Sequence, residues 1–531
     1  MSNHTRRQSL GSRQEHLRAD VCVIGAGIAG LIAATRIAAR SQLQVIVLES
    51  GTSTILDHQD LMASLDTVLN PDGVYQGIAR GRGVGGTSAK WAGKLLPLSP
   101  HDIAARPYLG LDAWPIDPET LSQHTRDIET MMEVDTGSYE HDLDTELDPH
   151  GRLPTHMEEI VWRWPKRPSK ANHRIDHVLR AELDRLPNLT IWTDATVAAL
   201  SVEMGRLAYV RARNHRGGDL LIEANNFVIA AGTLESTRLL LMTDEQNDGC
   251  ISRTTDSLGR YFNDHFGLEV AGFHSPSMGS INRVLADRKV GKTVRHLHGE
   301  LSKARQQSEG IGSAYFDFDA TFPNDSAISQ ARAAIASLRE RHIGETLRHF
   351  GGIAGDLRTV IDMLAWRARH RQQFWPDDAE VKVKIWIEQL PIAANRLRLA
   401  DKRDSLGVPM LRVDLTKTST DEHTLRAAMD SFKRCWHSIS PNTSLEWIPT
   451  AQRSVDSASE QAHPAGSTRM GHDLRHSVVN SALRVHAIDN VQIASASVFP
   501  SSGSANPTLT IMQLAMVVAD DILRRFGTTA L

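Results

Sequence analysis

The sequence has little cysteine, no excess of positive charge and no long apolar run. Only three of its 531 residues are cysteines, Cys22, Cys250 and Cys435, too few and too scattered for a disulfide framework or a cysteine-based zinc site. Lys and Arg number 59 against 63 Asp and Glu, a net charge of -4, so the chain has no basic field to attract nucleic acid or anionic lipid. No stretch reaches the ~20 consecutive apolar residues of a transmembrane helix, so we expect none.

The length of 531 residues is sufficient for two or three globular domains, each with its own core. The sparse cysteines predict a reducing, cytoplasmic location. Thr5–Leu10 resembles a twin-arginine export signal, but Gly11–Asp20 is polar and charged where such a signal needs an apolar segment. Residues 1–18 are polar, rich in Arg and without periodicity, which predicts a disordered lead-in.

The first ordered segment has the pattern of a dinucleotide-binding unit. A strand over Asp20–Ile24, the turn Gly25-Ala-Gly27-Ile-Ala-Gly30, a helix over Leu31–Ala39 and a strand over Gln44–Leu48 lead to Glu49. Gly25 permits a tight turn, Gly27 lets a pyrophosphate approach the backbone, and Gly30 lets the helix pack on the strand. Glu49 follows Gly30 by 19 residues, where a carboxylate accepts hydrogen bonds from the adenosine ribose. The alternative is a glycine turn that binds nothing.

A second glycine-rich stretch, Arg80–Gly93, holds five glycines in 14 residues. That density predicts a backbone lying close against a partner. A mobile loop is the alternative, but Thr87, Ser88, Lys90 and Trp91 are not linker residues, so a cofactor-facing loop is favoured. Further on, strands are predicted at Leu189–Trp192, Leu207–Arg213 and Phe227–Gly232, followed by a helix over Thr233–Met242.

The stretch Ser326–Trp375 is helical and basic, with eight Arg against four acidic residues. Leu357, Val360, Ile361 and Leu364 follow the spacing of one buried helix face. A lid, a subunit contact or a membrane-surface helix would fit this pattern. Glycines at positions 344, 351, 352 and 355 break the stretch, however, and favour a solvated pair of short helices packed on their own domain.

The C-terminal segments carry the residues best suited to catalysis. His463 opens the motif His463-Pro-Ala-Gly-Ser-Thr-Arg-Met-Gly471, and an apolar strand is predicted over Val491–Ala494. In Ser504-Ala-Asn506-Pro507, Asn506 is a preferred N-cap and Pro507 suits the first helical position of a largely apolar helix that continues to Arg525. We therefore expect a buried helix whose N-terminus faces a functional site.

In this order, the motifs resemble the glucose-methanol-choline (GMC) oxidoreductases, flavoenzymes that use FAD to oxidise alcohols. The resemblance extends over nearly the whole chain and includes the Trp114-Pro-Ile turn, the segment Ala230–Ser236 and the segment Leu258–His265. It implies an α/β fold with a Rossmann-like FAD-binding domain built from residues 19–100, 189–260 and 450–531. A second, α+β substrate domain with an antiparallel sheet would come from residues 101–188 and 261–449, with the basic helical insertion at 326–375.

The resemblance also implies the site residues. His463 is placed as the general base and Asn506 as the group holding the substrate oxygen, a pair most like that of the pyranose oxidase and cholesterol oxidase branch. Lys90 stands where pyranose oxidases carry the His that is bonded to FAD, so non-covalent FAD is expected, and Ser495 stands where many members carry an Asp. The implied cofactor-binding residues are Gly25, Gly27, Gly30, Glu49, Gly85, Gly86, Thr87, Lys90, Trp91, Val197, Ala231, Gly232, Ser495, Ala496, Pro507 and Thr508.

The function implied by the resemblance is FAD-dependent oxidation of an alcohol, a hydroxyl of a sugar, a glycoside or another polyol. A lyase that uses FAD without net redox turnover and a flavin-binding module with a non-catalytic site are the alternatives. No metal and no nucleic acid partner are expected, and His265 and His486 are interpreted as structural. The residues discriminate neither between oxygen, a quinone and a protein as electron acceptor nor between oligomeric states.

Overall fold

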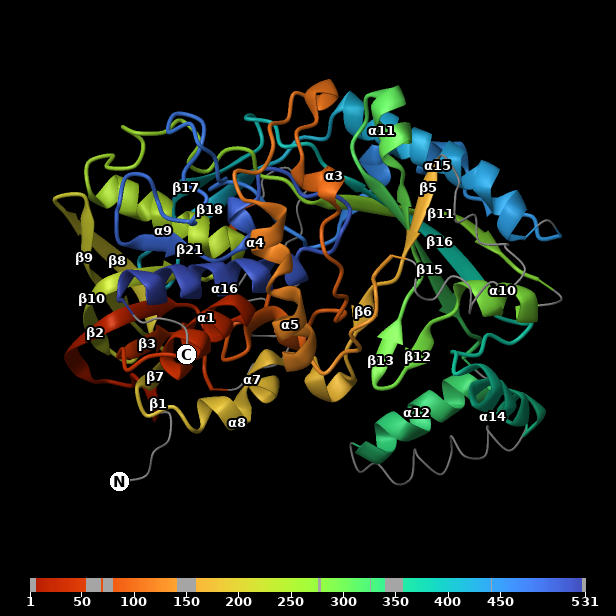
Figure 1. The fold of residues 1–531 in the computed structure, drawn as a ribbon, viewed down its shortest axis with the longest axis horizontal. Helices are drawn as coiled ribbons and strands as arrows, with labels where there is room; N and C mark the ends of the chain where they lie inside the picture. Colours follow the sequence, from red (N-terminus) through yellow and green to blue (C-terminus); the bar gives the residue numbers. More distant parts are fainter. Residues whose placement is uncertain are drawn as a thin grey trace.

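The computed structural model describes residues 6–53, 68–69, 80–140, 159–275, 278–324, 326–339, 357–440 and 442–527. Within these ranges, two large sheets lie side by side, each with a hydrophobic core of its own (Figure 1). None of the helices in these ranges combines the length and the apolar character that crossing a bilayer demands.

The first sheet is mostly parallel and follows the order β1-β7-β3-β2-β10-β9-β8, with β21 beside β10. Only β8 and β9 run antiparallel to their neighbours. Every residue of β3 is buried, as are the last four of β2, which is why these segments read as continuous Val and Ile runs. The strands are β1 (Arg6–Ser9), β2 (Gln14–Ile24), β3 (Val45–Leu48), β7 (Leu189–Thr193), β8 (Thr196–Glu203), β9 (Arg206–Arg213), β10 (Asp219–Ile229) and β21 (Val491–Ile493).

The helices of this half lie on the sheet and on one another. α1 (Ile28–Ala39) packs against α16 (Thr508–Arg525), and α9 (Gly232–Gln246) packs against β8 (Figure 1). After β2 the chain continues to β3 on one side, whereas β10 pairs with β2 on the other. The strand order therefore reverses at β2, and the carboxyl ends of these parallel strands open onto one crevice, the place where doubly wound sheets bind ligands.

The second sheet is antiparallel throughout, in the order β19-β11-β16-β15-β14-β5, with β20 beside β11. Helix α15 (Ser419–Ile439) packs on β15 and β16 and begins with a capping box of Thr418 and Asp421. The expected α/β fold with a second antiparallel sheet is thus confirmed. The strands are β5 (Ile160–Arg163), β11 (His265–Phe273), β14 (His298–Leu301), β15 (Ala314–Thr321), β16 (Glu380–Glu388), β19 (Glu446–Trp447) and β20 (Ser459–Glu460).

Shorter elements complete the described chain. Two three-stranded sheets have the orders β12-β13-β6 and β17-β18-β4. Their strands are β4 (Val68–Leu69), β6 (Lys166–Arg167), β12 (Arg288–Val290), β13 (Thr293–Arg295), β17 (Arg396–Arg403) and β18 (Pro409–Asp414). The remaining α-helices are α3 (Pro100–Ile103), α4 (Pro118–Ser122), α5 (Thr125–Met131), α7 (Ile175–Val178), α8 (Arg180–Leu183), α10 (Met278–Leu285), α11 (Lys303–Glu309), α12 (Ala327–Arg339) and α14 (Leu357–His370).

The disordered lead-in predicted for residues 1–18 is wrong for residues 6–18, while residues 1–5 lie outside the described chain. β1 pairs in parallel with β7, with Arg6 opposite Thr190, and β2 starts at Gln14, opposite Asp219 of β10. Side chains in the first half of β2 alternate between exposed and half-buried. A strand at the rim of a sheet tolerates polar residues on both faces, so polarity alone does not indicate disorder here.

The first core also contains residues from a part of the chain that was predicted to belong to the second domain. Residues 101–188 were assigned to the substrate domain, yet Trp114, Ile128 and Leu183 are buried in the first core, and α4 and α5 pack on α16. Trp162 and its strand β5 do belong to the second core. The physical reason is that α16 is buried along nearly its whole length and needs an apolar cover on the side away from the sheet.

Of the four residues predicted to form a buried helical face within 326–375, two are exposed and Val360 is half-buried. On α14, Ile361 is 64% exposed and Leu364 57% exposed, while the side chain of Leu357 lies outside the described structure. α14 contacts α12 (Figure 1). The ring of Trp366 in α14 lies against those of Phe374 and His370. The glycines expected to break this stretch lie outside the described residues.

The contribution of a leucine in these helices to the free energy of unfolding should therefore depend on its burial. Replacing Leu364 of α14 by Ala is expected to change the free energy of unfolding by less than about 0.5 kcal/mol, as for most surface substitutions. Leu425 of α15, 1% exposed, is the matched control, and Leu425→Ala should cost about 2–5 kcal/mol. Urea unfolding midpoints of the two variants measure this, and equal losses would mean that the exposed face of α14 is covered.

Candidate functional site

A cavity of about 540 Å³ opens at the crevice where the strand order reverses. Ile24, Leu48 and Ala230, at the carboxyl ends of β2, β3 and β10, line one part of it, and segments distant in sequence line the rest. The loop of residues 80–94, the segment 461–464 and the N-terminus of α16 all meet there. This cavity has the position expected for a dinucleotide.

The glycines of the first turn have different surroundings. A Cβ on Gly27 would have nothing within 4 Å, because it would point into the cavity. A Cβ on Gly30 would collide with the carbonyl oxygen of Gly25, and Gly25 itself has a φ of +106°, which favours glycine. Gly30 thus serves the packing of α1 on β2, while Gly27 leaves space that a cofactor phosphate would fill.

Glu49 joins the loops around the cavity. Its carboxylate accepts hydrogen bonds from the backbone N–H groups of Ala26 (2.9 Å), Gly51 (2.8 Å) and Gly83 (3.0 Å). Burial raises the pKa of Glu49, and the three N–H groups oppose that shift. The Ser50 hydroxyl and the N–H groups of Gly51 and Gly83 all donate to Oε1, so the acceptor position left for a ribose hydroxyl is on Oε2, which accepts only from Ala26 among the described residues. The bonds from Ala26 and Gly83 hold the first glycine turn against the second.

The second glycine-rich loop lies directly on the first. A Cβ on Gly86 would approach the Cα of Gly27 to 2.8 Å, and the Gly85 N–H donates to the carbonyl of Ala26 at 2.9 Å. Gly85 has a φ of +98°, and a Cβ there would collide with the carboxylate of Asp176. Two backbones can approach this closely only without side chains, which explains the glycine density of the loop.

The cavity brings together most of the residues that the sequence singled out. Gly30 and Gly85 lie behind it and shape the backbone. The residues that line it are Gly25, Gly27, Glu49, Gly86, Thr87, Lys90, Trp91, Val197, Ala231, Gly232, His463, Ser495, Ala496, Asn506, Pro507 and Thr508. Ser495 is 2% exposed, and its hydroxyl lies 2.6 Å from that of Ser497 in the short turn η6 (Ala496–Val498).

His463 and Asn506 face each other across one end of the cavity. The Nδ2 atom of Asn506 lies 3.3 Å from Nε2 of His463, and the backbone N–H of His463 donates to Oδ1 of Asp264 at 2.8 Å. Burial lowers the pKa of His463 well below its ordinary value, and the nearby His265 and Lys94 lower it further. The imidazole is therefore neutral near pH 7 and able to accept a proton.

The expected helix-capping role of Asn506 is wrong. α16 begins at Thr508 with Pro507 at the cap position, and no described side chain makes a capping hydrogen bond there. The Oδ1 atom of Asn506 is buried and accepts no hydrogen bond from any described residue, while its Nδ2 atom is directed to His463. Because Pro507 has no N–H and already occupies the turn, Asn506 is free to face the cavity.

The structure adds polar residues that sequence reasoning missed. Lys94, Asp317 and Gln461 also line the cavity. Nζ of Lys94 lies 2.7 Å from Oδ2 of Asp317, and the hydroxyl of Tyr315 donates to Oε1 of Gln461 at 2.7 Å. Lys94 directly follows the glycine loop and Gln461 precedes His463 by two positions, but no sequence spacing connects either of them with Asp317 of β15.

His265, interpreted from sequence as structural, lies next to His463. The Nδ1 atoms of the two rings are 3.0 Å apart. His486, in contrast, does not line this cavity and lies 3.0 Å from the hydroxyl of Ser477. In the described ranges, no three His, Cys, Asp or Glu side chains are grouped as a metal site would require.

Comparison with known proteins gives independent information about this site. The GMC oxidoreductase family model matches residues 391–515, and the FAD binding domain model matches residues 20–64. The chain is 26% identical to the fructose dehydrogenase large subunit of Gluconobacter japonicus over 64% of this chain and 53% of that one. It thus spans about half the length of this relative. It is 31% identical to 6'''-hydroxyparomomycin C oxidase of Streptomyces lividus, over 28% of this chain and 26% of that one.

Other matches cover more of the chain. 2-methyl-1,2-propanediol dehydrogenase of Mycolicibacterium austroafricanum is 23% identical over 84% of this chain and 81% of its own. Among solved structures, pyridoxine 4-oxidase from Mesorbium loti superimposes with a TM-score of 0.57 at 16% identity, covering 94% of this chain and 98% of that one. At this identity, the structural match supports the fold.

The fold and the glycine-lined cavity define a protein of the FAD-binding class, and the cavity fits FAD because Gly27 leaves the space a pyrophosphate needs. The two family matches thus assign a GMC oxidoreductase domain to residues 391–515 and a FAD binding domain to residues 20–64, with FAD as the cofactor.

The different surroundings of the two glycines predict different phenotypes. Gly27→Val is expected to fold with the stability of the parent apoprotein, because its side chain meets open space, but to purify with little or no FAD. Gly30→Val should unfold at clearly lower temperature even without cofactor, because its side chain collides with the Gly25 carbonyl. Flavin absorbance per protein and thermal melts of the apoproteins measure the two effects. Full FAD occupancy in Gly27→Val would contradict this assignment.

Proposed function

We propose that this protein oxidises a hydroxyl group of a sugar, glycoside or other polyol to a carbonyl group. The observation that carries the proposal is that His463 and Asn506, 3.3 Å apart, face the same cavity as the glycine turns that accommodate FAD. FAD, when bound, supplies the acceptor for the hydride that leaves the alcohol carbon. The chain itself must then bind the alcohol, orient it and take its hydroxyl proton.

The cofactor is held without a covalent bond in this proposal. Lys90 lines the cavity at the position where a histidyl link would be formed in the pyranose oxidases, and a lysine cannot form that bond. Gly25, Gly27 and the start of α1 would face the pyrophosphate, since N–H groups of a helix N-terminus favour anions. Glu49 has an acceptor position left for the ribose.

His463 is proposed as the general base. Transfer of a hydride from an alcohol requires that the hydroxyl proton leaves as well, and a neutral imidazole is well matched to accept it near pH 7. Burial keeps His463 neutral by lowering its pKa. Its Nε2 atom is the ring nitrogen closer to Asn506 and thus to the bound hydroxyl.

Asn506 is proposed to hold the substrate oxygen. Its Nδ2–H group, near His463 Nε2, can donate to an oxygen that develops negative charge. Asn506 is only 7% exposed, so water does not compete for this hydrogen bond. The N-terminus of α16 starts immediately after it and adds partial positive charge at this end of the cavity.

A hydroxyl-rich substrate agrees with the polar wall. Lys94, Asp317 and Gln461 offer donors and acceptors for neighbouring hydroxyls next to His463. Three relatives are named for hydroxylated compounds: fructose, 2-methyl-1,2-propanediol and a hydroxylated paromomycin. A sugar or polyol would exchange hydrogen bonds with water for bonds with this wall and so bind in one orientation.

Anaerobic flavin bleaching tests the proposal. The holoenzyme is mixed without oxygen with fructose, a 1,2-diol and an aminoglycoside in turn, and loss of the oxidised flavin absorbance is followed. We expect at least one of these classes to bleach the flavin with formation of one carbonyl per flavin. Consumption of a substrate without bleaching would indicate lyase chemistry, and absence of both for a broad panel of alcohols would overturn the proposal.

Removing the base should slow reduction without releasing the cofactor. For His463→Ala, we expect flavin reduction to be slower by about 10²-fold or more, the cost of losing general base catalysis, at unchanged FAD content. In the parent enzyme, the rate should stay constant from about pH 8 to about pH 6, because the lowered pKa keeps His463 neutral below its usual value of about 6.5. Stopped-flow reduction measures both, and a parent rate that falls with a midpoint near 6.5 would contradict a buried base.

Replacing Asn506 separates catalysis from stability. Because Asn506 does not cap α16, Asn506→Ala should keep the melting temperature and FAD content of the parent. Loss of a donor to the substrate oxygen should slow flavin reduction by about 10²–10³-fold, as for an oxyanion-hole amide. Asn506→Asp should also be slow, at least about tenfold, because an ionised carboxylate repels the developing alkoxide. An Ala variant that melts earlier but reduces its flavin normally would make Asn506 a structural residue.

A further inference from the structure

His265 and His463 form a buried pair whose backbones are tied to the same carboxylate. The N–H groups of His265 and His463 donate to Oδ1 of Asp264 at 2.7 Å and 2.8 Å. The two rings meet edge to face, with centroids 5.2 Å apart and an interplanar angle of 83°. Their Nδ1 atoms are 3.0 Å apart, so one of these nitrogens donates a hydrogen bond and the other accepts it.

The other nitrogen of His265 determines which one donates. Nε2 of His265 lies 2.8 Å from the carbonyl oxygen of Gly503, and a carbonyl oxygen can only accept. Nε2 of His265 therefore carries a proton. His265 is 1% exposed, and its burial lowers its pKa, so its ring is neutral and its Nδ1 atom has a free lone pair.

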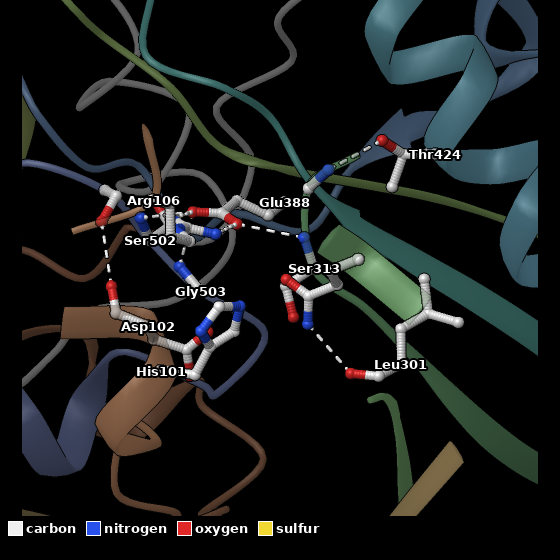
Figure 2. A network of polar contacts seen from close by, with 12 residues as sticks. His101, Asp102, Arg106, Leu301, Ser313, Glu388, Thr424, Ser502 and Gly503 are labelled. Atoms are coloured by element: carbon white, nitrogen blue, oxygen red, sulfur yellow. Dashed lines mark hydrogen bonds and ion pairs between the residues drawn. The ribbon is translucent and has the colours of Figure 1, made fainter. Parts of the chain in front are cut away.

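The Gly503 carbonyl is itself held in place. The N–H groups of Ser502 and Gly503 donate to Oε1 of Glu388 at 3.2 Å and 2.9 Å (Figure 2). Glu388 is paired through both oxygens with Arg106, at 2.6 Å and 2.7 Å. Gly503 has a φ of +60°, and a Cβ there would come within 2.6 Å of the Asp102 carboxyl carbon, so this position requires glycine.

We propose that the Gly503 carbonyl, acting through His265, sets the proton arrangement of His463, so that His463 carries its proton on Nδ1 and presents a bare Nε2 to the cavity. His265 Nδ1 accepts, so His463 Nδ1 must donate. Without substrate, the Nδ2–H of Asn506 donates to the lone pair of His463 Nε2, in agreement with their 3.3 Å separation, and a bound hydroxyl must replace Asn506 there before it gives up its proton. His265 is thus a positioning residue for the proposed base.

The reverse arrangement conflicts with the geometry. If His463 carried its proton on Nε2, its Nδ1 would need a donor in His265, whose Nε2 would then direct a lone pair at the Gly503 oxygen 2.8 Å away. A doubly protonated His265 would have the same effect on His463. Burial, the largest effect, and the nearby His298 oppose that charged form, whereas the Gly503 carbonyl, Glu388 and Gln461 favour it, and the net effect is a lowered pKa. The edge of Tyr315 also lies beside the ring.

This inference rests on the proposed base function of His463, but its first test needs no turnover. The holoenzyme is labelled with 15N-histidine, and correlation spectra distinguish bare from protonated ring nitrogens. Signals among the 24 histidines are assigned by comparing the parent with His463→Gln and His265→Asn. We expect protonated Nδ1 and bare Nε2 for His463, and the opposite for His265. A parent spectrum with His463 protonated on Nε2 would overturn the proposal.

Two variants of His265 are tested, so that the result does not depend on the correct folding of a single variant. His265→Phe keeps a ring but has no acceptor, so His463 should lose its single tautomer, and flavin reduction should slow at least about tenfold, toward the ~10⁴-fold cost of a misoriented tautomer. His265→Asn places its Oδ1 near the former Nδ1 and should restore both the His463 signal and most of the rate. His486→Phe, remote from the cavity, is the control and should match the parent.

The outcomes separate this proposal from the proposed function. If His463→Ala reduces its flavin slowly while His265→Phe keeps the parent rate and the parent His463 spectrum, His265 has no positioning role. If no alcohol bleaches the flavin of any variant, the proposed function fails, and the 15N spectra of the parent still decide the tautomer. A slow His265→Phe with an unchanged His463 spectrum would also contradict the mechanism, since the rate would then fall for another reason.

Discussion

The buried ion pair between Arg106 and Glu388 is the interaction on which the arrangement of the whole site depends. Both side chains are fully buried, and they form two short hydrogen bonds (Figure 2). Burial opposes ionisation of Glu388, but the guanidinium of Arg106 overrides this effect and lowers the pKa of Glu388 to about 2. Glu388 ends β16 of the second sheet, whereas Arg106 lies in the segment between Ile103 and Trp114, both of which are buried in the first core. Removing one partner of such a pair costs roughly 3–5 kcal/mol, because the other charge stays buried.

The carboxylate of Glu388 also connects the two cores to the histidines at the cavity. It also accepts hydrogen bonds from the backbone N–H of Ser313 in the second sheet's connection and from those of Ser502 and Gly503, a few residues before Asn506 and α16. The loop therefore has a defined position relative to both cores. From this loop, the Gly503 carbonyl contacts His265, and His265 contacts His463. Arg106 and Glu388 thus help to position His265 and His463 without lining the cavity themselves. The residues of the cavity wall can therefore differ between substrates without disturbing this support.

How much of the site was predictable depended on whether its residues act locally. Gly27, Gly30 and Glu49 lie in one strand-turn-helix-strand unit, where spacing alone indicates geometry. Gly27 and Glu49 line the cavity, and Gly30 packs against the Gly25 carbonyl. Asn506 shows the limit of local rules. Its sequence context, before Pro and an apolar helix, is typical of an N-cap, yet its side chain faces His463, because a contact across 43 positions took precedence over a local one. Asp317 and Glu388 had no sequence signal, since each meets its partner only through sheet formation.

The sequence by itself determined the strand-turn-helix unit with its glycines, because motif spacing is a property of neighbouring residues, and its resemblance to the GMC oxidoreductases implied the α/β fold, the antiparallel second sheet and the pairing of His463 with Asn506. Only the tertiary structure decided that residues 6–18 extend the first sheet, that part of the apolar face of α14 stays exposed, and that His265 stands behind His463. A polar segment becomes a strand when a sheet edge is available, and an apolar stripe is buried only when another element covers it. The proton arrangement of a histidine pair, likewise, depends on a carbonyl more than 200 positions away from His265, 2.8 Å from it in space.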